Sequence, residues 1–403
     1  MKFYELSPAQ RRAWLAERGI KLDEIDPAIL HELDHLSENV VGQLRLPVGI
    51  VPQIVVNGRN YIVPMATEET SVVAAANHGA SLFARGGGVE AVAYRDGIYG
   101  QVILQVDENF KVADLEQAFP DLIAQTNDYF ASLVRHGGGV RTITVHQQGD
   151  LVYLKVLIDP AEAMGANRAN AILEYLALKL ADYAGVVSKL FAILSNYPSQ
   201  FTKAEVSLNV KTVGGIATAK RIALLSQLGQ DDPYRAVTNN KGIMNGIDAV
   251  LLSTGNDTRA VEAACGVWAS HHGKYGSLSK WWLEGDLLVG QLVVPLAIGT
   301  VGGSINARKD VQENYQILGQ GITSSELAGV VAAIGLANNL AALHAIATAG
   351  IQAGHMKLQA RNIAASLTDN QAERAQLVKE LVDMRIYTQS AAEAVLKQIR
   401  EEK

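Results

Sequence analysis

The segment TITVHQQGDLVYLKVLI, residues 142–158, decides the fold of this chain. It holds two runs that are rich in β-branched and other apolar residues, Thr142–His146 and Leu151–Ile158, joined by Gln148-Gly149-Asp150. Two such runs around a short turn that contains glycine predict a pair of antiparallel strands in a hairpin.

The flanking sequence indicates the kind of sheet to which the hairpin belongs. Val102, Leu104 and Val106 alternate as in a strand, and residues 112–134 and 166–184 have helical periodicity. We take Val206–Val210 as the last strand. The order strand–helix–strand–strand–helix–strand is the split βαβ, or ferredoxin-like, pattern. The sequence therefore predicts a small domain at residues 98–213.

The rest of the chain is predicted to be mostly helical. Residues 1–97 and 214–351 would form one large, mixed domain, into which residues 98–213 are inserted. From Thr368 to the end, charged and apolar residues alternate at helical spacing, which predicts a C-terminal helical flap at residues 352–403. We therefore expect an α+β protein.

The composition excludes several classes of protein. The 403 residues are 48% hydrophobic and 19% charged, as in a packed soluble protein, and the net charge of −6 argues against nucleic-acid binding. One cysteine, Cys265, permits no intrachain disulfide and no Cys-rich metal site, which fits a reducing cytoplasm. The N-terminal residues lack the apolar core of a signal peptide, and the most apolar stretch, Leu327–Ala337, is too short to cross a bilayer, so we expect no membrane association.

Five glycine clusters could bring backbone N–H groups close to an anion, but none fits the dinucleotide fingerprint Gly-x-Gly-x-x-Gly. Most such clusters are simply turns. Gly165 stands out because it lies between a predicted strand and a predicted helix, where a phosphate would meet free N–H groups.

Several polar residues stand in apolar surroundings, and each has a structural alternative. Lys241 is either an electrophilic or acid–base lysine or one that extends to solvent from a loop. Asp257 fits a helix N-cap, and the pair Glu68-Glu69 either supports a helix dipole or contains a proton donor. His355 follows Gly354 and is either a structural residue or an acid for a leaving group. No spacing typical of a metal site or of a hydrolase nucleophile is present.

Taken together, these segments resemble one family, the class II (bacterial) 3-hydroxy-3-methylglutaryl-coenzyme A (HMG-CoA) reductases. Eight segments match in family order over nearly the whole chain: Glu38–Gly42, Val63–Glu69, Ala163–Asn167, Asp232–Arg235, Asn240–Asp248, Thr254–Asp257, Gly299–Gly303 and Gly354–Met356. The resemblance also accounts for the missing Rossmann motif, because this family binds its nicotinamide cofactor on a ferredoxin-like domain.

The resemblance implies an oxidoreductase that reduces HMG-CoA to mevalonate and coenzyme A in two hydride transfers from NAD(P)H, within isoprenoid synthesis. By resemblance, Glu69 is the general acid and Lys241 stabilises the oxyanion. Asp257 belongs to the hydrogen-bond network that tunes both residues, and His355 protonates the departing thiolate. No metal is implied.

The resemblance also assigns binding residues. The substrate contacts would be Ser71, Arg235, Asn245 and Asn339, and the cofactor contacts Met164, Gly165, Ala166, Asn167 and Asn196. Glu162 departs from the family pattern, which has an aspartate at this position. For the cofactor we favour NADP(H), because Arg135 would suit a 2′-phosphate, with NAD(H) as the alternative if Asp128 binds the ribose hydroxyls.

The resemblance further implies a homodimer whose active sites are built from both subunits. Two other readings of the chain remain: a silent relative that binds coenzyme A or a nucleotide without turnover, and a structural α/β protein. The direction of the reaction also stays open, since the same site can make mevalonate or degrade it.

Overall fold

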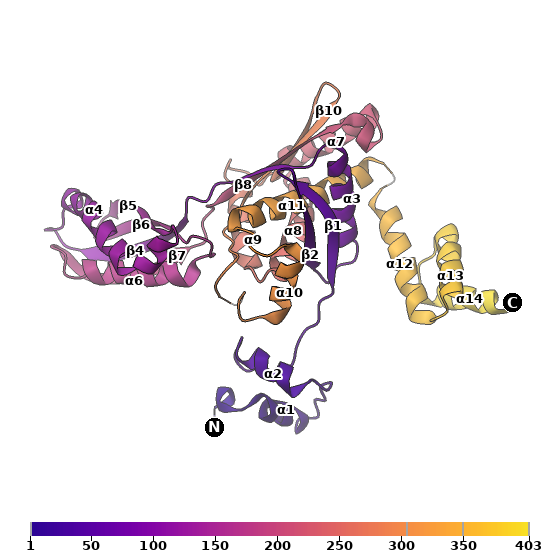
Figure 1. Ribbon diagram of the computed structural model, residues 1–403, viewed down its shortest axis with the longest axis horizontal. Coiled ribbons are helices and arrows are strands. Elements are labelled where there is room, and N and C mark those ends of the chain that lie inside the picture. Colours follow the sequence, from indigo (N-terminus) through magenta and orange to yellow (C-terminus); the bar gives the residue numbers. More distant parts are fainter. Residues whose placement is uncertain (1, 304, 349, 402–403) are drawn as a thin grey trace. The chain divides into compact units, whose positions relative to one another are not determined.

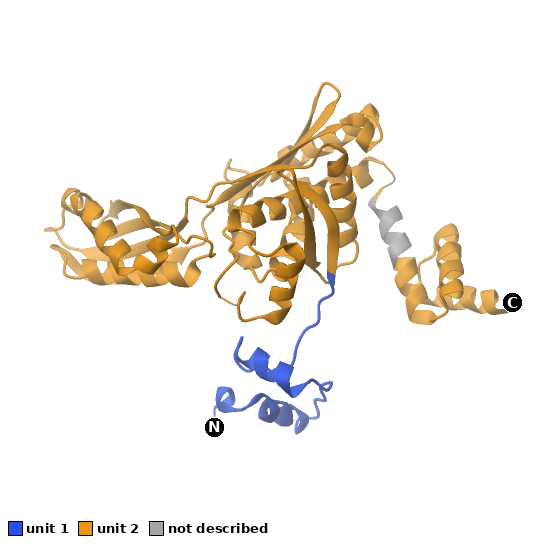
Figure 2. Cartoon of the chain, viewed as in Figure 1, with its two compact units in different colours: residues 1–48 blue, residues 49–403 orange. Residues whose placement is uncertain are grey.

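The computed structural model describes residues 2–303, 305–348 and 350–401, except for the side chains of residues 351–358. The chain divides into two compact units, residues 1–48 and residues 49–403 (Figure 2). The first unit was predicted to be part of the large domain. It contains a short 3-10 helix (Phe3–Glu5), α1 (Pro8–Ala16) and α2 (Pro27–Asp34). Ser7 and Gln10 cap the N-terminus of α1 by exchanging side-chain and backbone hydrogen bonds.

The ferredoxin-like motif is present. Its strands have the sheet order β5-β6-β4-β7, which is that of a split βαβ unit (Figure 1). Its elements are β4 (Ile98–Val106), α4 (Val112–Tyr129), α5 (Ala131–Arg135), β5 (Gly139–Gln148), β6 (Leu151–Asp159), α6 (Ala166–Leu180) and β7 (Val186–Ser195). The quoted segment forms the β5–β6 hairpin, in which Gln148 pairs with Leu151 and Gly149 has a φ of 62°. The hairpin was thus predicted correctly.

The last strand of this motif was predicted wrongly. The strand that closes it is β7, whereas residues 206–209 belong to β8 (Phe201–Asn209) in another sheet. The physical reason is exposure. The residues of β8 alternate regularly between buried and partly exposed positions, but β7 is exposed along much of its length and carries Lys189 among its apolar residues. The alternation of apolar and polar residues is therefore clearer in β8, which lies outside the motif, and the prediction chose β8 in place of β7.

A second four-stranded sheet has the order β3-β8-β10-β9 and is antiparallel throughout. It comprises β3 (Glu90–Ala93), β8, β9 (Ser279–Glu284) and β10 (Leu287–Pro295), and a separate hairpin is formed by β1 (Val48–Val56) and β2 (Arg59–Ala66). The helices of this part are α3 (Val72–Arg85), a short 3-10 turn (Val210–Val213), α7 (Ile216–Asp231), α8 (Pro233–Ser253), α9 (Thr258–Ala269), α10 (Lys309–Leu318) and α11 (Ser324–Ala347).

Helix α11 is the core of this part and packs against α3, α8 and both β3 and β8. Its 24 residues make it longer than the apolar stretch seen in the sequence, and by length and composition alone it could span a membrane. However, 78% of its apolar window is buried inside the molecule, as in a helix of a protein core.

The C-terminal segment folds into three helices, α12 (Ile351–Leu367), α13 (Gln371–Met384) and α14 (Gln389–Glu401). They share a small hydrophobic core that includes Ala364, Leu377 and Leu396. The predicted helical character of this segment is confirmed. Its mobility, its role as a flap and the exact domain limits stay predictions.

Close approach of α3 to α11 yields a test of the packing. A Cβ atom at Gly79 of α3 would overlap the backbone of Ala337 in α11. We expect Gly79→Ala to lower the free energy of unfolding by about 1–3 kcal/mol, because the two helix backbones must move apart. Chemical denaturation followed by circular dichroism measures the change.

The matched control is Gly266→Ala in α9, where an added Cβ would meet no atom within 4 Å. This change should be neutral, or stabilising by up to about 1 kcal/mol, because alanine has the higher helix propensity. Equal destabilisation by both substitutions would contradict the packing argument.

Candidate active site

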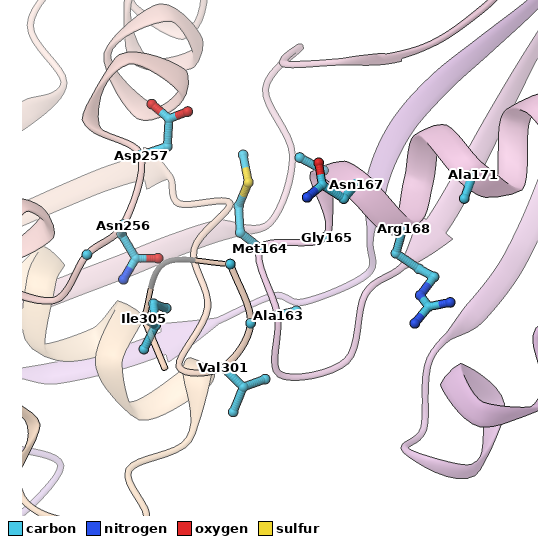
Figure 3. Close-up of a pocket in the computed structure, with 14 residues that line it drawn as sticks. Ala163, Met164, Gly165, Asn167, Arg168, Ala171, Asn256, Asp257, Val301 and Ile305 are labelled. Atoms are coloured by element: carbon cyan, nitrogen blue, oxygen red, sulfur yellow. The ribbon is translucent and has the colours of Figure 1, made fainter. Parts of the chain in front are cut away.

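Three segments that were singled out separately in the sequence meet at one cavity of about 430 Å³ (Figure 3). They are the loop before α6, the turn before α9 and the glycine-rich loop after β10. The lining residues are Ala163, Met164, Gly165, Ala166, Asn167, Arg168, Ala171, Gly255, Asn256, Asp257, Val301, Gly302, Gly303 and Ile305. The predicted cofactor residues Met164–Asn167 and the predicted catalytic Asp257 therefore line the same space.

Backbone contacts hold these segments together. The Thr300 N–H donates to the carbonyl of Glu162 at 2.9 Å, and Ala163 and Val301 form an isolated parallel bridge. At Gly299 a Cβ atom would overlap the backbone at Ala163 and Met164, so only glycine permits this approach. The Gly299 N–H donates to Asn256 Oδ1 at 2.8 Å, which ties the turn before α9 to the same loop.

The N-terminus of α6 is suited to an anion. Gly165 is its N-cap residue, has a φ of 97°, and offers no side-chain acceptor to the N–H groups of the first turn. These groups and the positive end of the helix dipole therefore face the cavity wall without an intrahelical partner. The donor set fits the phosphates of a dinucleotide.

Asp257 both lines the cavity and caps a helix. Its Oδ1 accepts hydrogen bonds from the Arg259 and Ala260 N–H groups at 3.0 and 3.1 Å and from Arg259 Nε at 3.3 Å. Burial raises the pKa of Asp257, but these hydrogen bonds and the charge of Arg259 outweigh burial, so the pKa lies below its usual value. The carboxylate is therefore ionised at neutral pH. Its proposed link to Lys241 and Glu69 stays a prediction.

Lys241 and Glu69 form an ion pair although they are 172 residues apart in the chain. Lys241 is in α8, Glu69 is in the loop between β2 and α3, and Nζ lies 2.5 Å from Oε2. The two side chains keep 58% and 40% of their surfaces exposed, so a ligand can reach them. Directly after this loop, Ser71 has a φ of 76° at the N-cap of α3, a strained conformation typical of functional segments. Neither Lys241 nor Glu69 is among the residues that line the cavity.

The other predicted substrate residues differ in their surroundings. Arg235 lies in the first turn of α8, and its Nε is buried without a partner among the described residues. Burial lowers the pKa of its guanidinium. Asn245, also in α8, is half-buried.

Asn339 of α11 is 1% exposed and is used within the core. Its Oδ1 accepts from Trp281 Nε1 at 2.7 Å and from Ser279 Oγ at 2.9 Å, and its Nδ2 donates to Asn239 at 2.9 Å. This geometry favours a structural role for Asn339 that ties α11 to α8 and β9.

Two predicted residues lie elsewhere or cannot be placed. Asn196 is exposed in the loop after β7 and is not among the cavity residues. His355 is part of α12, but its side chain lies outside the part of the chain that the structure describes. Within the described part, no group of three or more His, Cys, Asp and Glu residues could hold a metal ion.

Comparison with known proteins identifies the family. The family profile of hydroxymethylglutaryl-coenzyme A reductase matches residues 7–360. HMG-CoA reductase of Archaeoglobus fulgidus is 35% identical over 92% of this chain and 88% of its own length, and the probable HMG-CoA reductase of Borreliella burgdorferi is 37% identical over 91% and 87%. The chain belongs to the HMG-CoA reductase family.

Solved structures place the chain with the class II reductases. An HMG-CoA reductase from Streptococcus pneumoniae superposes with a TM-score of 0.76 at 35% identity, covering 98% of this chain and 99% of that one. A class II reductase from the same organism, described as bound to NADPH in open conformations, gives 0.75 at 37% identity over 98% of each chain. The α+β fold expected from the sequence is thereby confirmed, and the chain is an oxidoreductase of this family.

The sequence did not show which residue holds the two cavity loops of this reductase together. Arg95 lies between β3 and β4, and its Nη2 donates to the Ile298 carbonyl at 2.9 Å and lies 3.5 Å from the Ala161 carbonyl. These two carbonyls belong to the loop after β10 and the loop before α6, which form the cavity. Burial lowers the pKa of Arg95, while the charges of Glu162 and Asp159 raise it. A single arginine between two strands carries no motif that could have marked it.

Glu162, which replaces the aspartate of the family pattern, also holds one of these loops in place. Its Oε2 accepts a hydrogen bond from the Ser324 N–H at 2.6 Å, at the first residue of α11. The carboxylate thus joins the loop before α6 to the positive end of the core helix. Tyr315 of α10 contacts the loop after β10, because its hydroxyl donates to the Gly299 carbonyl at 3.3 Å. Burial raises the pKa of this hydroxyl to about 12.

The brace can be tested with Arg95→Met. Removing both carbonyl contacts should let the two loops separate, and displacements of this kind lower rates by up to about a hundredfold. We expect kcat/KM for reductase activity to fall at least about tenfold while the thermal midpoint changes by a few degrees, with partial recovery in Arg95→Lys.

The control for this experiment is Arg59→Met, which removes a surface ion pair to Glu326 outside the cavity. It should leave kcat/KM within about twofold, because exposed pairs contribute little. Unchanged kinetics in Arg95→Met would show that Arg95 does not position the loops.

Proposed function

We propose that this reductase converts HMG-CoA to mevalonate and coenzyme A, with two hydrides supplied by NADPH. The observation that carries the proposal is the contact of Lys241 with Glu69, a cation and an acid held 2.5 Å apart on an accessible surface. A thioester carbonyl that receives a hydride becomes an oxyanion, and a fixed cation next to it lowers the barrier.

The residues then have distinct tasks. Lys241 stabilises the oxygen of the hemithioacetal and later the alkoxide formed from mevaldehyde. Glu69 supplies the proton that this alkoxide takes up. His355 would protonate the thiolate of coenzyme A, so that it does not return to the aldehyde. Asp257, whose pKa lies below its usual value, would contribute the negative charge of its carboxylate to the hydrogen-bond network of Lys241 and Glu69.

The cofactor side is the cavity at the α6 N-terminus. The first-turn N–H groups of α6, with Met164 to Asn167, would hold the dinucleotide, and the reduced nicotinamide supplies hydride when it is bound there. NADPH is favoured over NADH because a similar class II reductase is described as bound to NADPH. The contact of Glu162 with α11 supports a bracing role for this residue rather than a direct contact with the cofactor.

The substrate carboxylate would meet Arg235. A guanidinium whose buried Nε has no partner among the described residues is costly, and a carboxylate on the hydroxymethylglutaryl arm would satisfy it with paired hydrogen bonds. Ser71 and Asn245 would add hydrogen bonds to the same arm. We include Asn339 only as support for α8, which carries Lys241, Arg235 and Asn245.

We further propose a cytoplasmic homodimer with shared active sites and a C-terminal flap from residue 352 that closes over the substrate. The alternatives are a reductase that runs physiologically toward mevalonate degradation and a silent relative that binds coenzyme A or a nucleotide. Loss of reduced-nicotinamide absorbance with HMG-CoA, or its gain with mevalonate, coenzyme A and oxidised cofactor, would show turnover and would separate a reductase of either direction from a silent relative. A silent relative would bind without either change.

Lys241→Ala tests the catalytic proposal. Loss of the cation should lower kcat by on the order of 10²–10³-fold, because the oxyanion loses its main electrostatic partner. The circular dichroism spectrum and thermal midpoint should stay close to those of the parent, since partly exposed ion pairs contribute little stability. Lys220→Ala, at an exposed position of α7, is the control and should keep full turnover. Normal turnover of Lys241→Ala would refute the assignment.

Deletion of residues 370–403 tests the flap while keeping His355. We expect kcat to fall at least about tenfold, because a site that stays open to water stabilises charge less well. Unchanged steady-state kinetics would count against a lid role for α13 and α14.

A further inference from the structure

One cation lies on the cavity wall. Among the lining residues that the structure describes, Arg168 is the one basic side chain and Asp257 the one acidic side chain. In Figure 3 the two lie well apart, with Met164 and Gly165 between them. The cavity therefore has a negative end and a positive end, and the positive end belongs to α6.

Arg168 stands in the first turn of α6, where a positive side chain faces the positive end of the helix dipole. Among the described residues it has no carboxylate within ion-pair distance. Arg168 is exposed, and its charge adds to the positive potential of the uncapped N–H groups beside it, so this end of the cavity favours an anion. An anion at this end of the cavity would satisfy both.

The guanidinium also reaches toward an aromatic cluster that is formed by the end of α4, the junction to α5 and α6 itself. Its Cζ lies 6.0 Å from the ring centre of Phe130, the residue between α4 and α5. Phe130 packs edge-on against Tyr175 at 5.8 Å, and Tyr129 stacks on Tyr175 at 4.4 Å. Tyr129 is 68% exposed, so the cluster offers an aromatic face to a planar ring.

We propose that Arg168 binds the 2′-phosphate of the cofactor's adenosine and is the residue that selects NADPH over NADH. This inference rests on the proposed function, and it assigns the phosphate to a different residue from Arg135, which the sequence favoured. A guanidinium beside an aromatic face matches an adenosine that carries an extra phosphate on its ribose. The nicotinamide end would then lie toward Met164 and Asp257.

Arg168→Gln is the test, measured as kcat/KM with NADPH and with NADH in the full-length protein. Loss of a charge-assisted contact should raise the KM for NADPH at least about tenfold, while kcat and the NADH parameters change by less than about threefold. Arg168→Lys should recover part of the NADPH preference. Lys220→Gln, at an exposed position of α7 outside the ferredoxin-like motif, is the control and should leave the ratio unchanged.

Two outcomes would overturn the proposal. Equal losses with both cofactors would assign Arg168 to the pyrophosphate that they share, and a fall in the ratio in Arg135→Gln, but not in Arg168→Gln, would assign the 2′-phosphate to Arg135.

A binding measurement separates this proposal from the proposed reaction. Calorimetry should show that the parent protein prefers adenosine 2′,5′-bisphosphate to adenosine 5′-monophosphate, and that Arg168→Gln loses at least about tenfold of this preference. No preference in the parent would refute the role of Arg168, whether or not the protein turns over HMG-CoA. Preference without turnover would refute the reaction and keep the site.

Discussion

The close backbone approach between the loop before α6 and the loop after β10 is the constraint on which the candidate site depends. It requires glycine at position 299, where any side chain would overlap Ala163 and Met164. Once the two loops touch, Asn256 ties the turn of Asp257 to the same place through the Gly299 N–H. Arg95 then binds a carbonyl of the loop after β10, and Glu162 ties the loop before α6 to the first residue of α11. A cavity thus results from backbone geometry before any catalytic side chain is considered.

Electrostatics gives this cavity and the Lys241–Glu69 pair their chemical character. Asp257 stays ionised because hydrogen bonds from α9 and Arg259 outweigh its burial. The Lys241–Glu69 pair is partly exposed, and such pairs contribute between about 0 and 1 kcal/mol to stability. Stability therefore does not explain why the two side chains meet, whereas the proposed stabilisation of an oxyanion and delivery of its proton would explain it.

Much of the fold could be predicted because periodicity and turn signals are local. The β5–β6 hairpin, the cap of α1 and the helical C-terminal segment all follow from short stretches of sequence. The closing strand of the motif could not be predicted in this way. An exposed strand such as β7 alternates weakly, and only its pairing with β4 shows where it belongs. Asn339 illustrates the same limit, because its partners Trp281 and Asn239 come from other elements.

The sequence by itself determined the ordered motifs, and through them the family. Each motif is a short run of residues that can be recognised without knowing which residues surround it in the fold. It also placed Gly165 at the start of a helix. Only the tertiary structure decided which motifs share a cavity and that Glu69 reaches Lys241. It also showed that Arg95 and Glu162 hold the cavity loops and that Arg168 lines the cavity. The reason is that contacts between residues far apart in the chain depend on how helices and loops pack. No local pattern of side chains encodes that packing.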